Sequence, residues 1–85
     1  MISYSIETKI VVGKKLLSRT NSSVRSEEAM KVAEIKSYIK DKMQYTADEI
    51  ESEKFEGEKP FNNDNVTVQP QKWLTYTISL KENNK

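Results

Sequence analysis

Basic side chains dominate the first third of the chain, and their chemistry is the binding of anions. From residue 8 to residue 25 every charged residue is positive. Arginine grips a carboxylate or a phosphate through two parallel N–H bonds, and lysine supplies a point charge for the same groups. The candidate contact residues of this stretch are Lys9, Lys14, Lys15, Arg19 and Arg25.

Three interpretations of this basic stretch stay open. It could be a solvated turn between two packed elements, a nucleic-acid contact, or a surface for an acidic protein partner. If a helix begins near Ser22 and Ser23, its free backbone N–H groups would help to hold a phosphate. The stretch is no Walker loop, because Gly13-Lys14-Lys15 lacks the required glycine spacing.

Trp73 is the second candidate contact residue. It alternates with Leu74 and Tyr76 in a segment typical of a strand, so it is expected to point away from the core. There it could stack on a base or anchor a protein contact. Alternatively, a loop that carries Phe55 or Phe61 could fold over the indole and bury it.

Tyr38 and Tyr45 are seven residues apart, so a helix would place them on one line. They could widen the core or anchor an interface. An acidic run follows and makes the chain an electrostatic dipole: Asp48, Glu49, Glu51, Glu53, Glu56 and Glu58, offset only by Lys54. This run could be a solvated helix face, could meet the basic stretch of a second copy, or could mimic phosphate toward a basic target.

Composition argues against several chemistries. The sequence has no cysteine and no histidine, which rules out zinc sites of the usual N/S type and removes the usual base of serine and cysteine hydrolases. The carboxylates lie in a polar segment where nothing would raise a pKa for acid–base work, and no EF-hand spacing is present. We therefore expect neither an enzyme nor a bound metal or cofactor.

The start of the sequence, Met1–Glu7, lacks the basic residues and the long apolar block of a signal peptide. No run of eighteen apolar residues occurs that would span a membrane. The expected location is the cytoplasm, without membrane association.

Hydrophobic periodicity predicts the elements at both ends and in the middle of the chain. Apolar residues at even positions indicate a strand over 2–12, with a short return strand over 16–20. Apolar residues three and four apart predict a helix over 26–45, begun by the polar residues 21–23. A capping box at Thr46–Glu49 favours a second short helix, unless one long helix bends there.

The rest of the chain is expected to form a mobile loop over 56–65, strands over 66–69 and 72–80, and a frayed tail over 82–85. The resulting α+β fold is a single domain over 1–85. We predict a two-layer sandwich, in which one long or broken helix covers one face of a mostly antiparallel sheet of three or four strands. The order is β(β)α(α)ββ.

In its lysine, glutamate and asparagine bias, the chain resembles the small early proteins of bacteriophages. The strand 2–12, the helix 26–45 and the strand 73–80 contribute to this resemblance through their order alone. The resemblance implies a stoichiometric inhibitor that binds a host defence protein, toxin or nuclease in the host cytoplasm, and some such inhibitors also bind RNA.

The predicted function is therefore a small non-catalytic binding protein that blocks a host protein. One alternative is an RNA- or single-stranded-DNA-binding domain, although a net charge of only +1 counts against it. The other is a structural protein that self-associates as a homo-oligomer. The predicted contact residues are Lys9, Lys14, Lys15, Arg19, Arg25 and Trp73.

Overall fold

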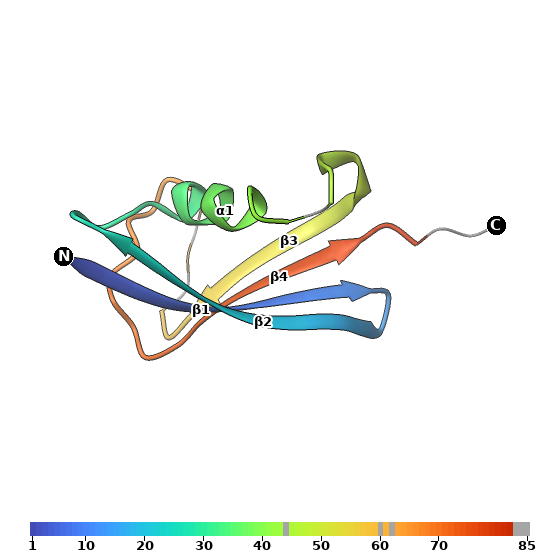
Figure 1. The fold of residues 1–85 in the computed structure, drawn as a ribbon, viewed down its shortest axis with the longest axis horizontal. Coiled ribbons are helices and arrows are strands. Elements are labelled where there is room, and N and C mark those ends of the chain that lie inside the picture. The colour runs from blue at the N-terminus through green and yellow to red at the C-terminus, as the bar shows by residue number, and fades with distance from the viewer. Residues whose placement is uncertain (44, 60, 62, 83–85) are drawn as a thin grey trace.

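One four-stranded sheet and one α-helix form the two layers of the computed structural model, which describes residues 1–43, 45–59, 61 and 63–82. The helix lies across one face of the sheet (Figure 1). This arrangement confirms the predicted α+β sandwich. The elements are β1 (Ile2–Val12), β2 (Lys15–Ser26), α1 (Val32–Lys40), the short 3₁₀ helix η1 (Ala47–Glu49), β3 (Ile50–Gly57) and β4 (Leu74–Leu80).

The strands lie in the order β2-β1-β4-β3. β1 pairs antiparallel with β2, and β3 pairs antiparallel with β4, while the central pair of β1 and β4 is parallel. A parallel pair needs a long crossover, and the chain from β2 through α1 and β3 supplies it. The sheet is therefore mostly antiparallel, as predicted, with β2 and β3 as its two edges.

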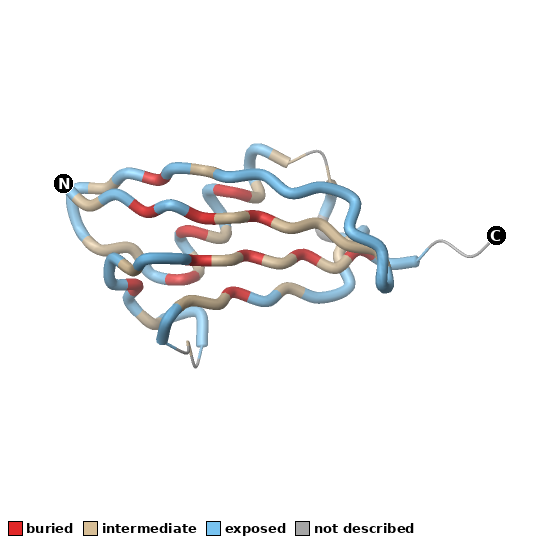
Figure 2. The backbone as a smooth tube through the Cα atoms, turned by 90° about the horizontal axis from the view of Figure 1, so that it is seen from below, coloured by how far each residue is buried: buried red, intermediate tan, exposed pale blue. Residues whose placement is uncertain are grey.

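Side chains of alternate residues build the core on the helix side of the sheet. In β1, Tyr4 and Ile6 are buried, and in β4 every second residue from Leu74 to Leu80 is buried (Figure 2). The helix contributes its predicted apolar stripe. The buried residues of that stripe are Val32, Ile35 and Ile39.

The predicted start of the helix is wrong. Residues 21–23 lie in β2, where Asn21 pairs with Glu7 and Ser23 pairs with Ser5. The long strand β1 needs a partner along its whole length, and this tertiary pairing overrides the capping preference of the polar residues. The helix instead begins at Val32, where the Glu34 carboxylate accepts a hydrogen bond from the Lys31 N–H at 3.0 Å.

The predicted second helix is present only as the three-residue η1, and most of the acidic segment forms an edge strand instead. The predicted cap is there: the Glu49 carboxylate accepts hydrogen bonds from the Thr46 N–H at 3.3 Å and from the Thr46 hydroxyl at 3.2 Å. Only η1 is helical there, and β3 follows it directly. Phe55 is buried beside Tyr76, and this contact with the ladder to β4 outweighs the helix propensity of the glutamates. Because α1 ends at Lys40, Tyr45 lies outside the helix that was expected to carry it.

The predicted strand over 66–69 does not form, and this segment does not join the sheet. Thr67 forms an isolated bridge with Lys31, and the Val68 N–H donates to the Met30 carbonyl at 2.8 Å. Val68 is fully buried, so the predicted alternation of apolar residues serves the core from a connecting segment. Residues 60, 62 and 83–85 belong to the predicted mobile loop and tail and lie outside the described residues.

Candidate functional site

The predicted basic residues gather on the hairpin of β1 and β2. Lys9 and Arg19 are direct cross-strand partners, and Arg25 pairs with Ser3. These positions alternate with the core residues of β1, so they lie on the open face of the sheet, opposite α1. The structure thus brings Lys9 and Arg19 together and places Arg25 on the same face, farther along β2.

The hairpin tip carries the other two predicted residues. Lys14 lies in the turn, and Lys15 begins β2. All residues from 13 to 21 are exposed, including two leucines with nearly half of their surface in solvent, Leu16 and Leu17. Two exposed leucines next to two lysines form an amphipathic tip, and no element of the described part of the chain covers it.

Two glutamates moderate the charge of the open face. Glu7 lies 3.5 Å from Arg19 and 3.7 Å from Lys9, and on the far edge Lys54 lies 3.3 Å from Glu56. Exposed ion pairs of this kind contribute little stability, and a stronger anionic partner can replace them. The open face is therefore a mixed-charge surface.

Trp73 directly precedes β4 and has 48% of its surface exposed. The alternative that Phe55 or Phe61 buries the indole is wrong, because Phe61 packs on Phe55 instead, with ring centroids 5.2 Å apart. Leu74 is buried on the helix side, so alternation carries Trp73 toward the open face. The paired register of β4 with β1 begins two residues later, where Thr75 pairs with Glu7.

The two edges of the sheet carry opposite charges. β2 holds three basic residues and no acidic one, whereas β3 holds three glutamates and a single lysine, Lys54. The dipole predicted from the sequence thus runs across the sheet from one edge strand to the other. An anionic partner would be drawn to β2.

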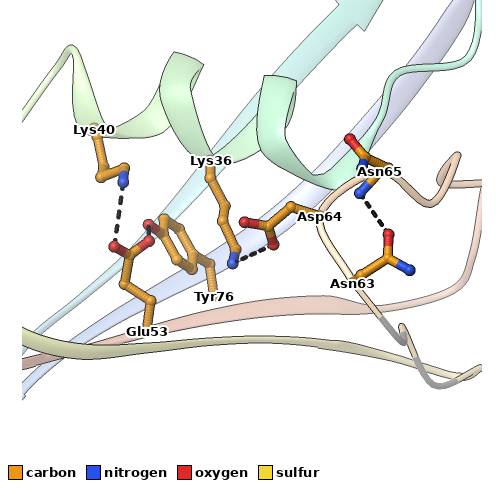
Figure 3. A network of polar contacts seen from close by, with 7 residues as sticks. All are labelled: Lys36, Lys40, Glu53, Asn63, Asp64, Asn65 and Tyr76. Carbon is orange, nitrogen blue, oxygen red and sulfur yellow. Dashed lines mark hydrogen bonds and ion pairs between the residues drawn. The ribbon is translucent and has the colours of Figure 1, made fainter.

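A polar network joins α1 to β3 and β4 (Figure 3). The Tyr76 hydroxyl and the Lys40 ammonium both donate to the Glu53 carboxylate, the latter at 3.2 Å. Lys36 pairs with Asp64 at 2.9 Å, which ties the helix to the loop before residue 66. These charges are paired within the fold, so the network stabilises the contact of the helix with the sheet and with the loop.

The pKa values of this network follow from its contacts. Burial acts to raise the pKa of Glu53, but the hydrogen bonds from Tyr76 and Lys40 outweigh it and hold that pKa below its ordinary value. Burial and the hydrogen bond to Glu53 raise the pKa of the Tyr76 hydroxyl well above its ordinary value. Tyr76 therefore stays protonated and Glu53 stays charged at neutral pH.

A groove on the helix side of the sheet escaped the sequence analysis. It lies between β1, β2 and the chain around the end of α1, and it contains the buried Thr8 and the exposed Tyr38. Tyr38 was expected at a core edge or an interface, and Tyr45 lines the same groove and packs partly against the core. One feature of the sequence could have indicated this groove. Thr8 is the polar residue between Ile6 and Ile10 in the row of even-numbered residues that faces the core.

Among the described residues, no cluster of acidic side chains is arranged to hold a metal ion. No helix of the described chain is long and apolar enough to cross a membrane. The chain matches no protein-family model, no curated protein and no solved structure.

Proposed function

We propose that this chain is a small non-catalytic binding protein that blocks a partner protein through the outer edge of β2. In the setting that its composition suggests, the partner is a host defence protein or toxin, and the chain is a phage-type inhibitor in the host cytoplasm. One observation carries the proposal. β2 is a twelve-residue edge strand, and its outer side is unpaired within the described chain.

An edge strand offers a row of backbone N–H and C=O groups to another strand. β2 contains no proline that would interrupt such pairing, and its single bulge lies at the tip, opposite Ile10 and Val11. A partner strand could therefore extend the sheet along residues 18–26. Strand addition of this kind gives affinity through the main chain and specificity through the side chains.

The side chains of β2 favour an acidic partner segment. Lys15, Arg19 and Arg25 supply the only charges of this strand. Lys14 adds a fourth charge at the turn, next to Leu16 and Leu17, which would anchor an apolar residue of the partner. A partner that offers an extended acidic strand flanked by an apolar residue would match this edge in charge and in shape.

The proposal is tested by affinity capture of the tagged protein from host lysate, with and without nuclease, followed by reconstitution with the purified partner. We expect one protein partner that survives nuclease and moderate salt. The double variant Lys15→Glu/Arg19→Glu should lose it. The matched control is Lys54→Glu, which reverses a charge on the opposite edge and should retain it.

Recovery of no partner, or equal loss in the Lys54→Glu control, would rule out recognition at the β2 edge. The double variant Leu16→Ser/Leu17→Ser distinguishes the contribution of the hairpin tip to binding from that of the strand edge, because it removes the apolar anchor and leaves the charges intact. We expect this variant to weaken binding about tenfold or more, as loss of an apolar anchor does at an interface.

A second candidate function is binding of single-stranded nucleic acid on the open face. It is favoured by a cross-strand row in which Arg19, Lys9 and Lys54 flank Thr77, with the exposed Trp73 on the same side. Here bases would stack on the indole and the cations would contact phosphates. The ion pairs that Glu7 forms with Lys9 and Arg19, and that Glu56 forms with Lys54, partly neutralise these cations and count against this function.

The same variants separate the two functions. A nucleic-acid complex should weaken steeply with salt, and Lys54→Glu should weaken it as much as Lys9→Glu does. Binding of a protein at the β2 edge should be unchanged by Lys54→Glu. Intrinsic Trp73 fluorescence, titrated with labelled single-stranded RNA at low salt, would report stacking directly, and no change would remove the nucleic-acid function.

A further inference from the structure

The groove beside α1 has the composition of a small-molecule site, and it lies on the other face of the sheet from Trp73. It exists because the helix is short. α1 spans nine residues, about 13 Å, whereas β1 spans eleven residues, about 36 Å. The helix therefore covers only one end of the sheet (Figure 1), and a cavity of about 350 Å³ opens along the uncovered part of β1 and β2.

Hydroxyl groups line the sheet side of this groove. Thr8 and Thr20 are direct cross-strand partners, and Ser22 and Ser18 occupy the neighbouring positions of the same face on β2. These four positions face the same side as the core residues Tyr4 and Ile6. On its sheet side the groove thus presents a ladder of hydrogen-bonding groups, with Ile10 as the apolar residue beside them.

Thr8 is the member of this ladder that folding does not explain. Only 5% of its surface is exposed, and its Oγ1 atom has no hydrogen-bond partner among the described residues. A buried hydroxyl without a partner is costly, and valine would have the same shape without that cost. Thr8 lines the cavity, and rotation about its Cα–Cβ bond would turn the shielded hydroxyl toward a group that enters it.

The opposite wall of the groove is aromatic and carries one charge. Tyr38 is 40% exposed, and the Lys42 ammonium lies 4.2 Å from the centre of its ring and 3.0 Å from its hydroxyl oxygen. Met43 and Tyr45 add a polarisable sulfur and a second ring to this wall. Lys42 is the only charged residue among the described lining residues.

We propose that this groove binds a small planar aromatic molecule that carries a carboxylate. The ring packs against Tyr38, Met43 and Tyr45, where aromatic and sulfur contacts are favourable. The carboxylate pairs with Lys42, and the Thr8 hydroxyl donates to an oxygen of the ligand. A cavity of about 350 Å³ lies at the small end of ligand pockets, which suits a substituted single or fused ring.

This site is independent of the proposed function, because its side chains face the helix side, whereas a strand added to β2 would pair with backbone atoms at the edge. The full chain is therefore tested alone, by titration of the ¹⁵N-labelled protein with three probes: 4-hydroxybenzoate, indole-3-carboxylate and the neutral analogue 4-hydroxybenzamide. We expect saturable shifts of the amide signals of Thr8, Thr20 and Lys42 with at least one of the two carboxylates.

Two variants test the assigned contacts. Thr8→Val keeps the shape of the side chain, removes one hydrogen bond, and should weaken carboxylate binding about fivefold while leaving thermal stability equal or higher. Thr77→Val is its matched control: the same change on the open face of the same sheet should leave binding unchanged. Lys42→Gln should weaken binding of the carboxylate and should not affect 4-hydroxybenzamide.

Three results would overturn the proposal. The first is the absence of saturable shifts with either carboxylate at millimolar concentration. The second is shifts that centre on residues of the open face. The third is an affinity that Thr8→Val and Thr77→Val alter equally, which would mean that the Thr8 hydroxyl does not contact the ligand.

Discussion

The hydroxyl of Tyr76 donates a hydrogen bond to the carboxylate of Glu53, and this contact joins the central strand β4 to the edge strand β3 beneath the helix (Figure 3). Lys40 of α1 donates to the other oxygen of the same carboxylate. A glutamate on the core-facing side of an edge strand is thereby fixed from two directions. The stability of the fold should consequently depend on pH through Glu53 at acid pH and through Tyr76 at alkaline pH.

At acid pH the protein should lose the contribution of Glu53. The pKa of Glu53 is lower in the folded chain than in the unfolded chain, so its contribution is present above the unfolded pKa, about 4.3, and disappears as pH falls through the folded pKa. The free energy of unfolding of Glu53→Gln should therefore approach that of the original protein as pH falls below about 4. Urea denaturation at several pH values measures this.

Glu51→Gln is the matched control, since it makes the same charge change at an exposed position of β3. At neutral pH we expect it to change the free energy of unfolding by less than about 0.5 kcal/mol. A gap between Glu53→Gln and the original protein that stays constant down to the lowest pH would contradict the assigned network.

At alkaline pH the relevant group is Tyr76, whose pKa is raised in the folded chain. Its contribution is fully present below the unfolded pKa, about 10, and is lost as pH rises above that value, because only the unfolded chain then releases the proton. Tyr76→Phe should cost about 1.5–3 kcal/mol at neutral pH, the usual value for a hydrogen bond to a charged group. That cost should shrink above pH 10, as measured by urea denaturation.

Tyr4→Phe should destabilise the fold although it removes a single oxygen atom. The Tyr4 hydroxyl donates to the Val68 carbonyl at 2.7 Å and accepts from the Met30 N–H at 3.0 Å, so it ties β1 to two connecting segments. We expect a loss of about 1–3 kcal/mol, because the change leaves two backbone groups without a partner. Thermal unfolding would show this, with Tyr38→Phe as an exposed control that changes little.

Gly13 turns the hairpin with a φ of +59°, a conformation that other residues adopt at a cost. Gly13→Ala should therefore destabilise the chain by about 1 kcal/mol, and Gly13→Asn by less, since asparagine tolerates this region better. Thermal unfolding of both variants measures the difference. Equal stability of all three proteins would mean that the turn relaxes to another conformation.

The sequence correctly predicted those elements in which the spacing of the apolar residues matches the face that is buried in the fold. The alternation over 2–12 and 72–80 predicted the two central strands, which the structure places at Ile2–Val12 and Leu74–Leu80, because each buries one face against the helix. The stripe of Val32, Ile35 and Ile39 predicted the helix for the same reason. The basic run and the acidic run were also evident, but their positions in space were not.

The edge strands were decided by tertiary structure. Locally, the polar residues 20–26 favour a helix cap and the glutamates of 50–57 favour a helix. Both segments instead pair with a central strand, because the N–H and C=O groups of β1 and β4 need hydrogen-bond partners. The same pairing sets the basic strand and the acidic strand on opposite edges and leaves a groove where the helix ends. The sequence by itself determined the charges of this protein and the spacing of its core-facing residues. Long-range strand pairing decided which surfaces those charges form, because cross-strand neighbours are set by register and not by proximity in the chain.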